Sequence, residues 1–320
     1  MPPWAGSQWE ALKLDLPVVV ALSGGADSTA LLRACHEKWP GRVAAVHVNH
    51  GLQAAASDFE SHCRTLCRSL GVPLHCEHLS IHLEKGESLE QVARDARYAA
   101  LIQAVKTHWP QGAAVLLAHH ADDQVETVLL ALLRGAGLPG LAAMPERFER
   151  QGVLFIRPWL HVDASSIRTW LRDVGQNWVE DPSNQNLQHT RNRIRLALGP
   201  VLAEHFPAHR QTLGRSARHA AQAQQLLHEL ALGDLLLCGD PPRIADLRAL
   251  NPARRANALR CWLNVQGLRA SASQLDELVA QIEDCSTRGH RIELKVGIGQ
   301  VVRKGEVLVG YNLALPRGQD

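Results

Sequence analysis

The sequence predicts an α/β protein with a doubly wound, parallel five-stranded sheet, followed by a second, smaller α+β domain. Three observations predict this fold class. Short apolar runs alternate with helical patterns in the first half, a glycine-rich turn joins the first run to the first helix, and the alternation ends before residue 210. Such alternation is typical of βαβ units, in which a helix connects two parallel strands.

The expected strands are short, mostly apolar runs, the pattern of strands buried on both faces of a parallel sheet. They cover residues 16–22, 43–48, 74–79, 113–118 and 153–156. Between them apolar residues recur at helical spacing, which predicts helices through Leu31 and Leu32 and over 59–70, 89–106 and 125–133.

A domain boundary is expected near residue 205. Residues 181–189 are polar and turn-prone, and a long helical pattern starts after Pro207. We therefore predict a catalytic domain over residues 1–205 and a helical or α+β domain over 206–320. The second domain should hold helices over 247–263 and 275–282, then short strands near 292–296, 301–302 and 307–309.

Charge and composition exclude some classes of protein. Residues 1–205 carry 19 Lys+Arg and 21 Asp+Glu, net −2, whereas residues 206–320 carry 15 and 11, net +4. This mild excess suits a polyanion such as RNA, and equally an ordinary solvated arginine face. Seven irregularly spaced cysteines do not form a disulfide framework, and no apolar run or leader indicates a membrane or secreted protein. We expect a cytoplasmic location; a homodimer is compatible with the sequence.

The turn after the first strand is the first candidate site. It reads Ser23-Gly24-Gly25-Ala26-Asp27-Ser28-Thr29 and opens a helix, the setting in which backbone N–H groups and hydroxyls hold phosphate. Asp27 could bind Mg²⁺. The alternative is a plain turn with Asp27 or Ser28 as N-cap. A Walker loop is excluded because no Gly-Lys-Ser/Thr follows.

This Ser-Gly-Gly-x-Asp-Ser turn resembles the PP-loop of the N-type ATP pyrophosphatases. The resemblance implies ATP as cofactor, cleaved between its α and β phosphates so that AMP is transferred to the substrate. The expected nucleotide site comprises Ala21, Leu22, Ser23, Gly24, Gly25, Ala26, Asp27 and Ser28, with Asp27 as the Mg²⁺ ligand.

A second constellation follows the strand at 113–118, in the run His119-His120-Ala121-Asp122-Asp123-Gln124-Val125-Glu126. Carboxylates in a first helical turn also complement the helix dipole, which is their commoner role when they occur singly. Ligands bind at the carboxyl ends of parallel strands where the strand order reverses. This cluster therefore shares a crevice with the glycine turn if the two strands are neighbours.

Residues 117–144 resemble the most characteristic segment of the tRNA(Ile)-lysidine synthetase family. The resemblance implies that Asp123 and Glu126 help to hold a lysine substrate, whose ammonium groups need carboxylate partners. Its carboxylate needs a cation, for which Arg94 and Arg97 are candidates, although both could be exposed helix arginines. We expect Asp27, Asp123, Glu126 and Arg97 to be the catalytic residues.

Two further motifs match this family. His47 and His50 fit His-x-x-His-Gly-Leu beside the nucleotide site, where with His119 they should hydrogen-bond rather than bind a metal. Asn184, Arg191, Asn192 and Arg195 fit the family's RNA-facing Glu-Asp-x-Ser-Asn and Arg-Asn-x-x-Arg, although alone they could be a solvated face. More arginines give a candidate RNA surface: Arg210, Arg215, Arg218, Arg248, Arg254, Arg255, Arg260 and Arg269.

The resemblance implies that the wobble cytidine of an isoleucine tRNA with a CAU anticodon is adenylated by ATP and then joined to L-lysine, giving lysidine. Many family members carry a further C-terminal domain that engages tRNA, which leaves open whether this chain is a short form or part of a longer one. The alternatives are a PP-loop tRNA thiolase, disfavoured because no Cys-x-x-Cys occurs, and a non-catalytic nucleotide- or RNA-binding module.

Overall fold

The structure, a computed structural model, describes residues 2–4, 8–49, 56–80, 89–287, 289–297 and 299–312. The chain forms two compact units, Met1–His219 and Ala220–Asp320, which divide within helix α10 (His209–Cys238). The boundary between 205 and 206 stays a prediction. Among the described residues, no helix combines the length and the apolar character needed to cross a membrane.

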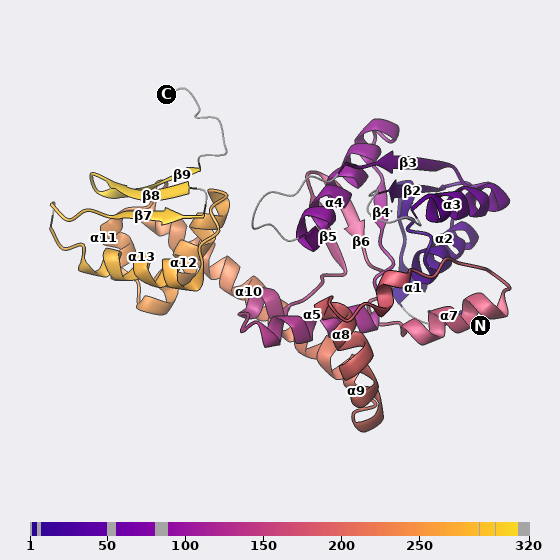
Figure 1. Cartoon of the computed structure of the whole chain (residues 1–320). Coiled ribbons are helices and arrows are strands. Elements are labelled where there is room, and N and C mark those ends of the chain that lie inside the picture. Colours follow the sequence, from indigo (N-terminus) through magenta and orange to yellow (C-terminus); the bar gives the residue numbers. More distant parts are fainter. Residues whose placement is uncertain are drawn as a thin grey trace. The chain divides into compact units, whose positions relative to one another are not determined.

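The first unit contains a six-stranded sheet with the order β3-β2-β1-β4-β6-β5 (Figure 1). Five strands are mutually parallel and correspond to the five expected ones: β1 (Val18–Ala21), β2 (Val43–Asn49), β3 (Leu74–His78), β4 (Ala114–Leu116) and β6 (Val153–Ile156). The expected number of strands was wrong by one, because β5 (Arg147–Arg150) pairs antiparallel with β6. Its side chains alternate between exposed and half-buried, as suits an edge strand.

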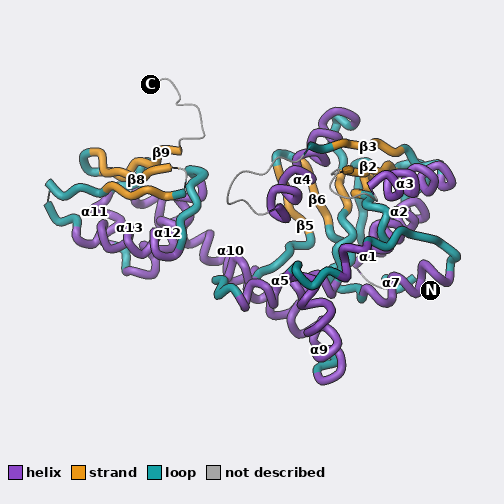
Figure 2. Tube along the Cα trace, viewed as in Figure 1, coloured by secondary structure: helices purple, strands orange, loops and turns teal. Residues whose placement is uncertain are grey.

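Helices cover both faces of this sheet (Figure 2). Val18 and Val20 of β1 join one apolar core with α2 (Ala26–Lys38) and α7 (Ala164–Asp173). Val19 points the opposite way, into a core with α4 (Leu89–His108). The unit's remaining helices are α1 (Gln8–Ala11), α3 (Ala56–Leu70), α5 (Ala121–Leu133), α6 (Leu138–Leu141), α8 (Thr190–Arg193) and α9 (Gly199–His205).

The strand order determines where a ligand can bind. From β1 the chain moves outward to β2 and β3, and then returns to place β4 on the other side of β1. The order therefore reverses between β1 and β4, and this switch point is where open α/β sheets bind ligands. The glycine turn follows β1 and the acidic cluster follows β4, so the expected neighbourhood of the two is confirmed.

The second unit consists of helices and a small antiparallel sheet, as expected. The sheet has the order β7-β8-β9, formed by β7 (Glu293–Val296), β8 (Gly299–Lys304) and β9 (Val307–Asn312). The helices include α11 (Ile244–Ala249), α12 (Pro252–Val265) and α13 (Ala272–Asp284). The helical pattern over 247–263 is interrupted at Asn251, whose side chain accepts a hydrogen bond from Arg254 N at 3.0 Å and so begins α12.

Candidate active site

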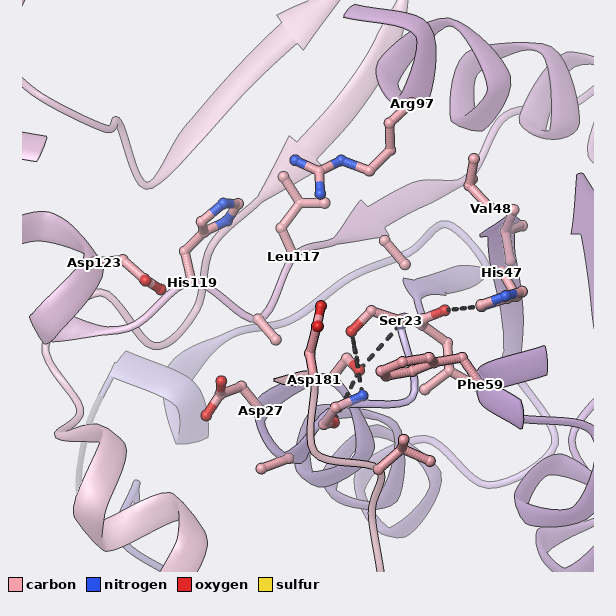
Figure 3. A pocket seen from close by; sticks show the side chains of 18 of the residues that line it. Ser23, Asp27, His47, Val48, Phe59, Arg97, Leu117, His119, Asp123 and Asp181 are labelled. Atoms are coloured by element: carbon pink, nitrogen blue, oxygen red, sulfur yellow. Dashed lines mark hydrogen bonds between the residues drawn. The ribbon is translucent and has the colours of Figure 1, made fainter. Parts of the chain in front are cut away.

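A cavity of about 460 Å³ opens at the carboxyl ends of β1, β2 and β4 (Figure 3). Most of the residues expected to form the site line it: Ala21, Leu22, Ser23, Gly25, Ala26, Asp27, Ser28, His47, Arg97, His119, Asp123, Asn184 and Arg195. Residues from the proposed nucleotide, lysine and RNA sites thus meet in one cavity. His50 lies outside the described residues.

The glycine turn leaves its helix end open toward the cavity. Gly25, not Asp27 or Ser28, is the N-cap of α2, and no side chain caps it. The Ser28 hydroxyl instead lies 3.1 Å from Ser23 N and 3.2 Å from Gly24 N, and it donates to Gly25 O. A helix N-terminus without a side-chain cap keeps free N–H groups, which suits a phosphate.

Gly24 is required by this turn for two reasons. Its φ of +90° lies in the region that side chains rarely adopt. A Cβ atom there would also lie 3.2 Å from Cys63 Sγ and 3.2 Å from Phe59 Cδ1. The turn is therefore pressed against α3, and a larger residue at position 24 would displace it.

Asp27 lies in the first turn of α2 with one oxygen available. Its Oδ2 lies 3.6 Å from His120 Nε2, whereas Oδ1 is buried without a hydrogen-bond partner among the described residues. Burial alone would raise the pKa of Asp27, but the hydrogen bond and charge of His120, together with the charges of Arg168 and Arg195, outweigh burial and lower it. An ionised carboxylate with a free buried oxygen fits a Mg²⁺ ligand.

His120 belongs to the run singled out after β4, although no role was assigned to it there. It lies between Asp27 of the glycine turn and the carboxylates of Asp122 and Asp123. Burial alone would lower its pKa, but the carboxylates of Asp123, Asp27 and Asp122 raise it to about 9. Its Nδ1 lies 3.3 Å from Asp123 N and 3.5 Å from Asp123 Oδ2. A protonated ring donates toward this carboxylate rather than accepting from the amide.

Arg195 forms ion pairs with both carboxylates expected to hold lysine. Its Nε lies 2.6 Å from Glu126 Oε1 and its Nη2 lies 3.2 Å from Asp123 Oδ1. Glu126 is 2% exposed, and its second oxygen, Oε2, has no hydrogen-bond partner in the described part of the chain. Burial raises the pKa of Glu126, against the opposing effect of Arg195. Arg195, which was expected to contact RNA, is thus paired with the two carboxylates that were expected to bind lysine.

The cavity wall near His119 is less acidic. Arg97 extends from α4 toward Leu117 and His119 (Figure 3). His119 Nδ1 is buried without a hydrogen-bond partner among the described atoms. Burial, with the nearby Arg157, Arg97 and Arg94, lowers its pKa far below the ordinary value, so the ring is neutral. Burial also lowers the pKa of Arg97.

His47 takes the hydrogen-bonding role expected of it. It is 4% exposed, and its Nδ1 lies 2.8 Å from Leu22 O, the carbonyl that precedes the glycine turn. Burial lowers its pKa, so the neutral ring donates to this carbonyl. His47 therefore fixes the end of β1 against β2.

Some expected site residues lie outside the cavity lining. Asn192 is buried, and its Nδ2 donates to Asn186 O at 2.8 Å. Arg191 Nε lies 3.1 Å from Glu90 Oε1, and Arg94 lies over the Tyr98 ring. Glu126 does not line the cavity itself but is hydrogen-bonded to Arg195, which does. The RNA and substrate roles of these residues remain predictions.

The candidate RNA surface requires corrections. Arg255 was wrongly expected there: it is 4% exposed and donates to the carbonyls of Leu247, Arg248 and Leu250. The Arg210 Nε donates to Asp122 Oδ1 at 2.7 Å. Asp122 is 88 residues from Arg210, so no local pattern indicates this pair. The carbonyls that Arg255 binds are five to eight residues away, but they come within reach only because the chain turns between α11 and α12.

Arg168 also lines the cavity and was not anticipated. A faint signal existed, because Arg168 stands between Ala164 and Leu171 at helical spacing, on the apolar side of α7. A cation on the buried face of an amphipathic helix indicates a polar partner or a site.

Comparison with known proteins shows the family. A family model described as a PP-loop domain matches residues 10–202, and one described as a TilS substrate binding domain matches residues 243–308. The tRNA(Ile)-lysidine synthase of Polaromonas naphthalenivorans is 54% identical over 291 residues, covering 91% of this chain and 88% of that protein. The enzyme of the same name from Ralstonia nicotianae is 44% identical over 83% of this chain, which spans 58% of its length.

Solved structures show the same fold. The U34-tRNA thiolase from Methanococcus maripaludis superposes with a TM-score of 0.55 at 17% identity, covering 66% of this chain and 73% of that one. At this identity the likeness concerns the fold alone, and the absence of Cys-x-x-Cys and the sequence relatives disfavour a thiolase. The matched PP-loop model, the substrate-binding domain and the relatives agree: the chain belongs to the tRNA(Ile)-lysidine synthase family and is a ligase of that type.

Proposed function

We propose that this chain joins L-lysine to carbon 2 of the wobble cytidine in the isoleucine tRNA with a CAU anticodon, forming lysidine and releasing AMP and pyrophosphate. The observation that carries the proposal is the shared cavity, with the open glycine turn on one side and, on another, Asp123 and the Arg195 that joins it to Glu126. Adenylation needs a phosphate cradle, and lysine needs carboxylates. The glycine turn and Asp123 line the same cavity.

The glycine turn would hold ATP. The N–H groups at the start of α2 would donate to the phosphates. The hydroxyls of Ser23 and Ser28, which bond each other and Gly25 O in this structure, would have to turn toward the phosphates to donate as well. Asp27 would hold Mg²⁺, which when bound neutralises phosphate charge. His47 keeps the turn in register with β2, beside the proposed nucleotide site.

The reaction proceeds in two displacements. The carbon-2 oxygen of cytidine attacks the α phosphorus, the bond to pyrophosphate breaks, and the adenylated base then loses AMP to a lysine amine. Asp123 and Glu126 would hold lysine ammonium groups, and Arg97 would face its carboxylate. No protein nucleophile is required, so positioning and charge neutralisation supply the acceleration.

The tRNA would approach over the segment that holds Asn184, Arg191, Asn192 and Arg195. Asn184 and Arg195 line the cavity directly, while Asn192 supports the loop through Asn186. An enzyme acting on tRNA belongs in the cytoplasm, and a homodimer remains an expectation.

The test is incorporation of labelled lysine. The protein is incubated with ATP, Mg²⁺, radiolabelled lysine and an unmodified transcript of this tRNA, and acid-stable label in the RNA is counted. We expect label only with the complete mixture, and none with a transcript whose wobble cytidine is uridine. Absence of label from the complete mixture would contradict the proposal, and release of pyrophosphate without label would indicate that a group other than lysine displaces AMP.

A further inference from the structure

Helix α7 brings Arg168 to the cavity from the side of the sheet that also carries α2. Ile167 and Leu171, its neighbours on the helix face, are both 0% exposed and belong to the same apolar core as Leu31 and Leu32 of α2. An additional hydrogen bond joins Arg33 of α2 to Gln176, just beyond α7. The backbone that carries Arg168 is therefore fixed relative to the helix that begins at the glycine turn.

The guanidinium of Arg168 makes no hydrogen bond and no ion pair within the part of the chain that the structure describes. Its Nε is buried and makes no hydrogen bond, and none of its nitrogens forms an ion pair. This separates it from Arg195 and Arg210, which are both held by carboxylates. A buried N–H donor without a partner is costly unless a ligand supplies the acceptor.

Arg168 and Asp27 line the same cavity. The charge of Arg168 helps to keep Asp27 ionised. A bound Mg²⁺ triphosphate carries more negative charge than one cation neutralises, and the turn has no Gly-Lys-Ser/Thr lysine to contribute. The chemistry of the site thus calls for a cation beside the turn, and Arg168 is such a cation with free donors.

We propose that Arg168 binds the β and γ phosphates of ATP and then the departing pyrophosphate, in the place that a P-loop lysine fills in other nucleotide folds. The inference rests on the proposed function, which supplies the pyrophosphate. The free Nε and the terminal nitrogens give a planar donor set that matches two phosphate oxygens. AMP, which lacks the β and γ phosphates, would not contact Arg168.

The experiment compares nucleotides with and without these phosphates. Dissociation constants of Mg-ATP, AMP and inorganic pyrophosphate are measured for the wild type, R168M, R168K and R172M. Arg172 lies one turn further along α7 and is exposed, so R172M is the matched control. For R168M we expect ATP and pyrophosphate to bind about tenfold to 100-fold more weakly, as for a lost charge-assisted contact, with AMP unchanged within about twofold.

R168K should recover part of the loss, because it keeps the charge and loses the planar fork. Equal weakening of AMP and ATP in R168M and R168K, or unchanged pyrophosphate binding in both, would overturn the proposal. The Tm of each variant is recorded, and R168K provides the measurement should R168M not fold. These binding measurements do not depend on lysine transfer. A wild type that binds ATP but makes no lysidine would refute the proposed function, whereas the ratios of the dissociation constants of variant and wild type would still test the role of Arg168.

Discussion

Arginine side chains pair with buried carboxylates in both compact units, but the surroundings of the pairs differ. In the first unit Arg195 bridges Asp123 and Glu126 at the cavity. In the second unit Arg254 of α12 donates hydrogen bonds to both carboxylate oxygens of Asp234 of α10, whose side chain is fully buried. The chemistry of the two pairs is the same.

The two pairs differ in whether buried carboxylate oxygens are left without a hydrogen-bond partner. Asp234 uses both carboxylate oxygens on one guanidinium, whereas Glu126 keeps a buried oxygen without a hydrogen bond in the described structure. Asp27 and His119 also keep unused buried atoms, and both line the cavity. Fully paired charges indicate a structural role, while unpaired buried atoms beside a cavity indicate a binding site. The second unit tests this reading, since its pairs should affect folding and not chemistry.

The strongest test of this comparison is Asp27→Asn. The substitution keeps the shape of the side chain and removes the charge that faces His120 and the proposed Mg²⁺. We expect lysidine formation to fall roughly 100-fold to 1000-fold, the cost of removing one charged group from a reacting centre, with little change in Tm. The measurement is kcat/KM for tRNA. The control is Asp173→Asn, which alters an exposed carboxylate at the end of α7. Equal activities of the two variants would show that the unpaired buried oxygen of Asp27 does not mark a binding site.

In the second unit, Arg255→Met should act on folding. The arginine is buried and satisfies three backbone carbonyls at the end of α11 and after it. Their loss of partners should lower the free energy of unfolding by about 3 kcal/mol. Chemical denaturation measures this, with AMP binding by the first unit expected to persist. A variant as stable as the wild type would show that these bonds are not structural.

His120 should make the first unit sensitive to alkaline pH. Its pKa in the folded chain, about 9, exceeds the ordinary value of 6.5. The protonated ring therefore contributes stability that is complete below about 6.5 and is lost as the pH rises through about 9. We expect Tm to fall between pH 7 and 9.5, and His120→Asn to reduce this dependence. An identical slope in the variant would mean that other groups cause it.

The smallest effect concerns an exposed arginine on the helix that carries Arg255. Arg260 is exposed and has no hydrogen bond or ion pair within the described residues, so it remains a candidate for RNA contact. Arg260→Gln should weaken tRNA binding a few-fold and reduce the slope of log affinity against log salt by about one, without lowering Tm. Binding is measured by filter retention over a salt series. An unchanged slope would remove Arg260 from the candidates.

Much of the fold could be predicted because parallel strands are buried on both faces and therefore read as apolar runs. The five such strands were all expected, and so was the meeting of the turns after β1 and β4. Strand β5 was missed because Arg147, Glu149 and Arg150 give an edge strand the appearance of a polar loop. The break between α11 and α12 was missed because apolar residues continue at helical spacing across it, although Asn251 and Pro252 form a typical helix start.

For the site, the segments that contribute residues could be predicted from the sequence, but the ion-pair and hydrogen-bond partners of those residues could not. The glycine turn and the acidic run could be recognised because both are short, local motifs that resemble those of known families. Their expected roles in holding phosphate and ammonium groups remain proposals. The pairing of Arg195 with Glu126, 69 residues apart, and the burial of Arg255 could not, because both depend on which helices pack together.

The sequence by itself determined the fold class, the glycine turn after β1 and the acidic run after β4, since these depend on local conformation and on periodic burial. Only the tertiary structure decided which arginines are held, which are buried and which remain available. Ion pairing and burial depend on distances between segments far apart in the chain, and no local pattern contains those distances.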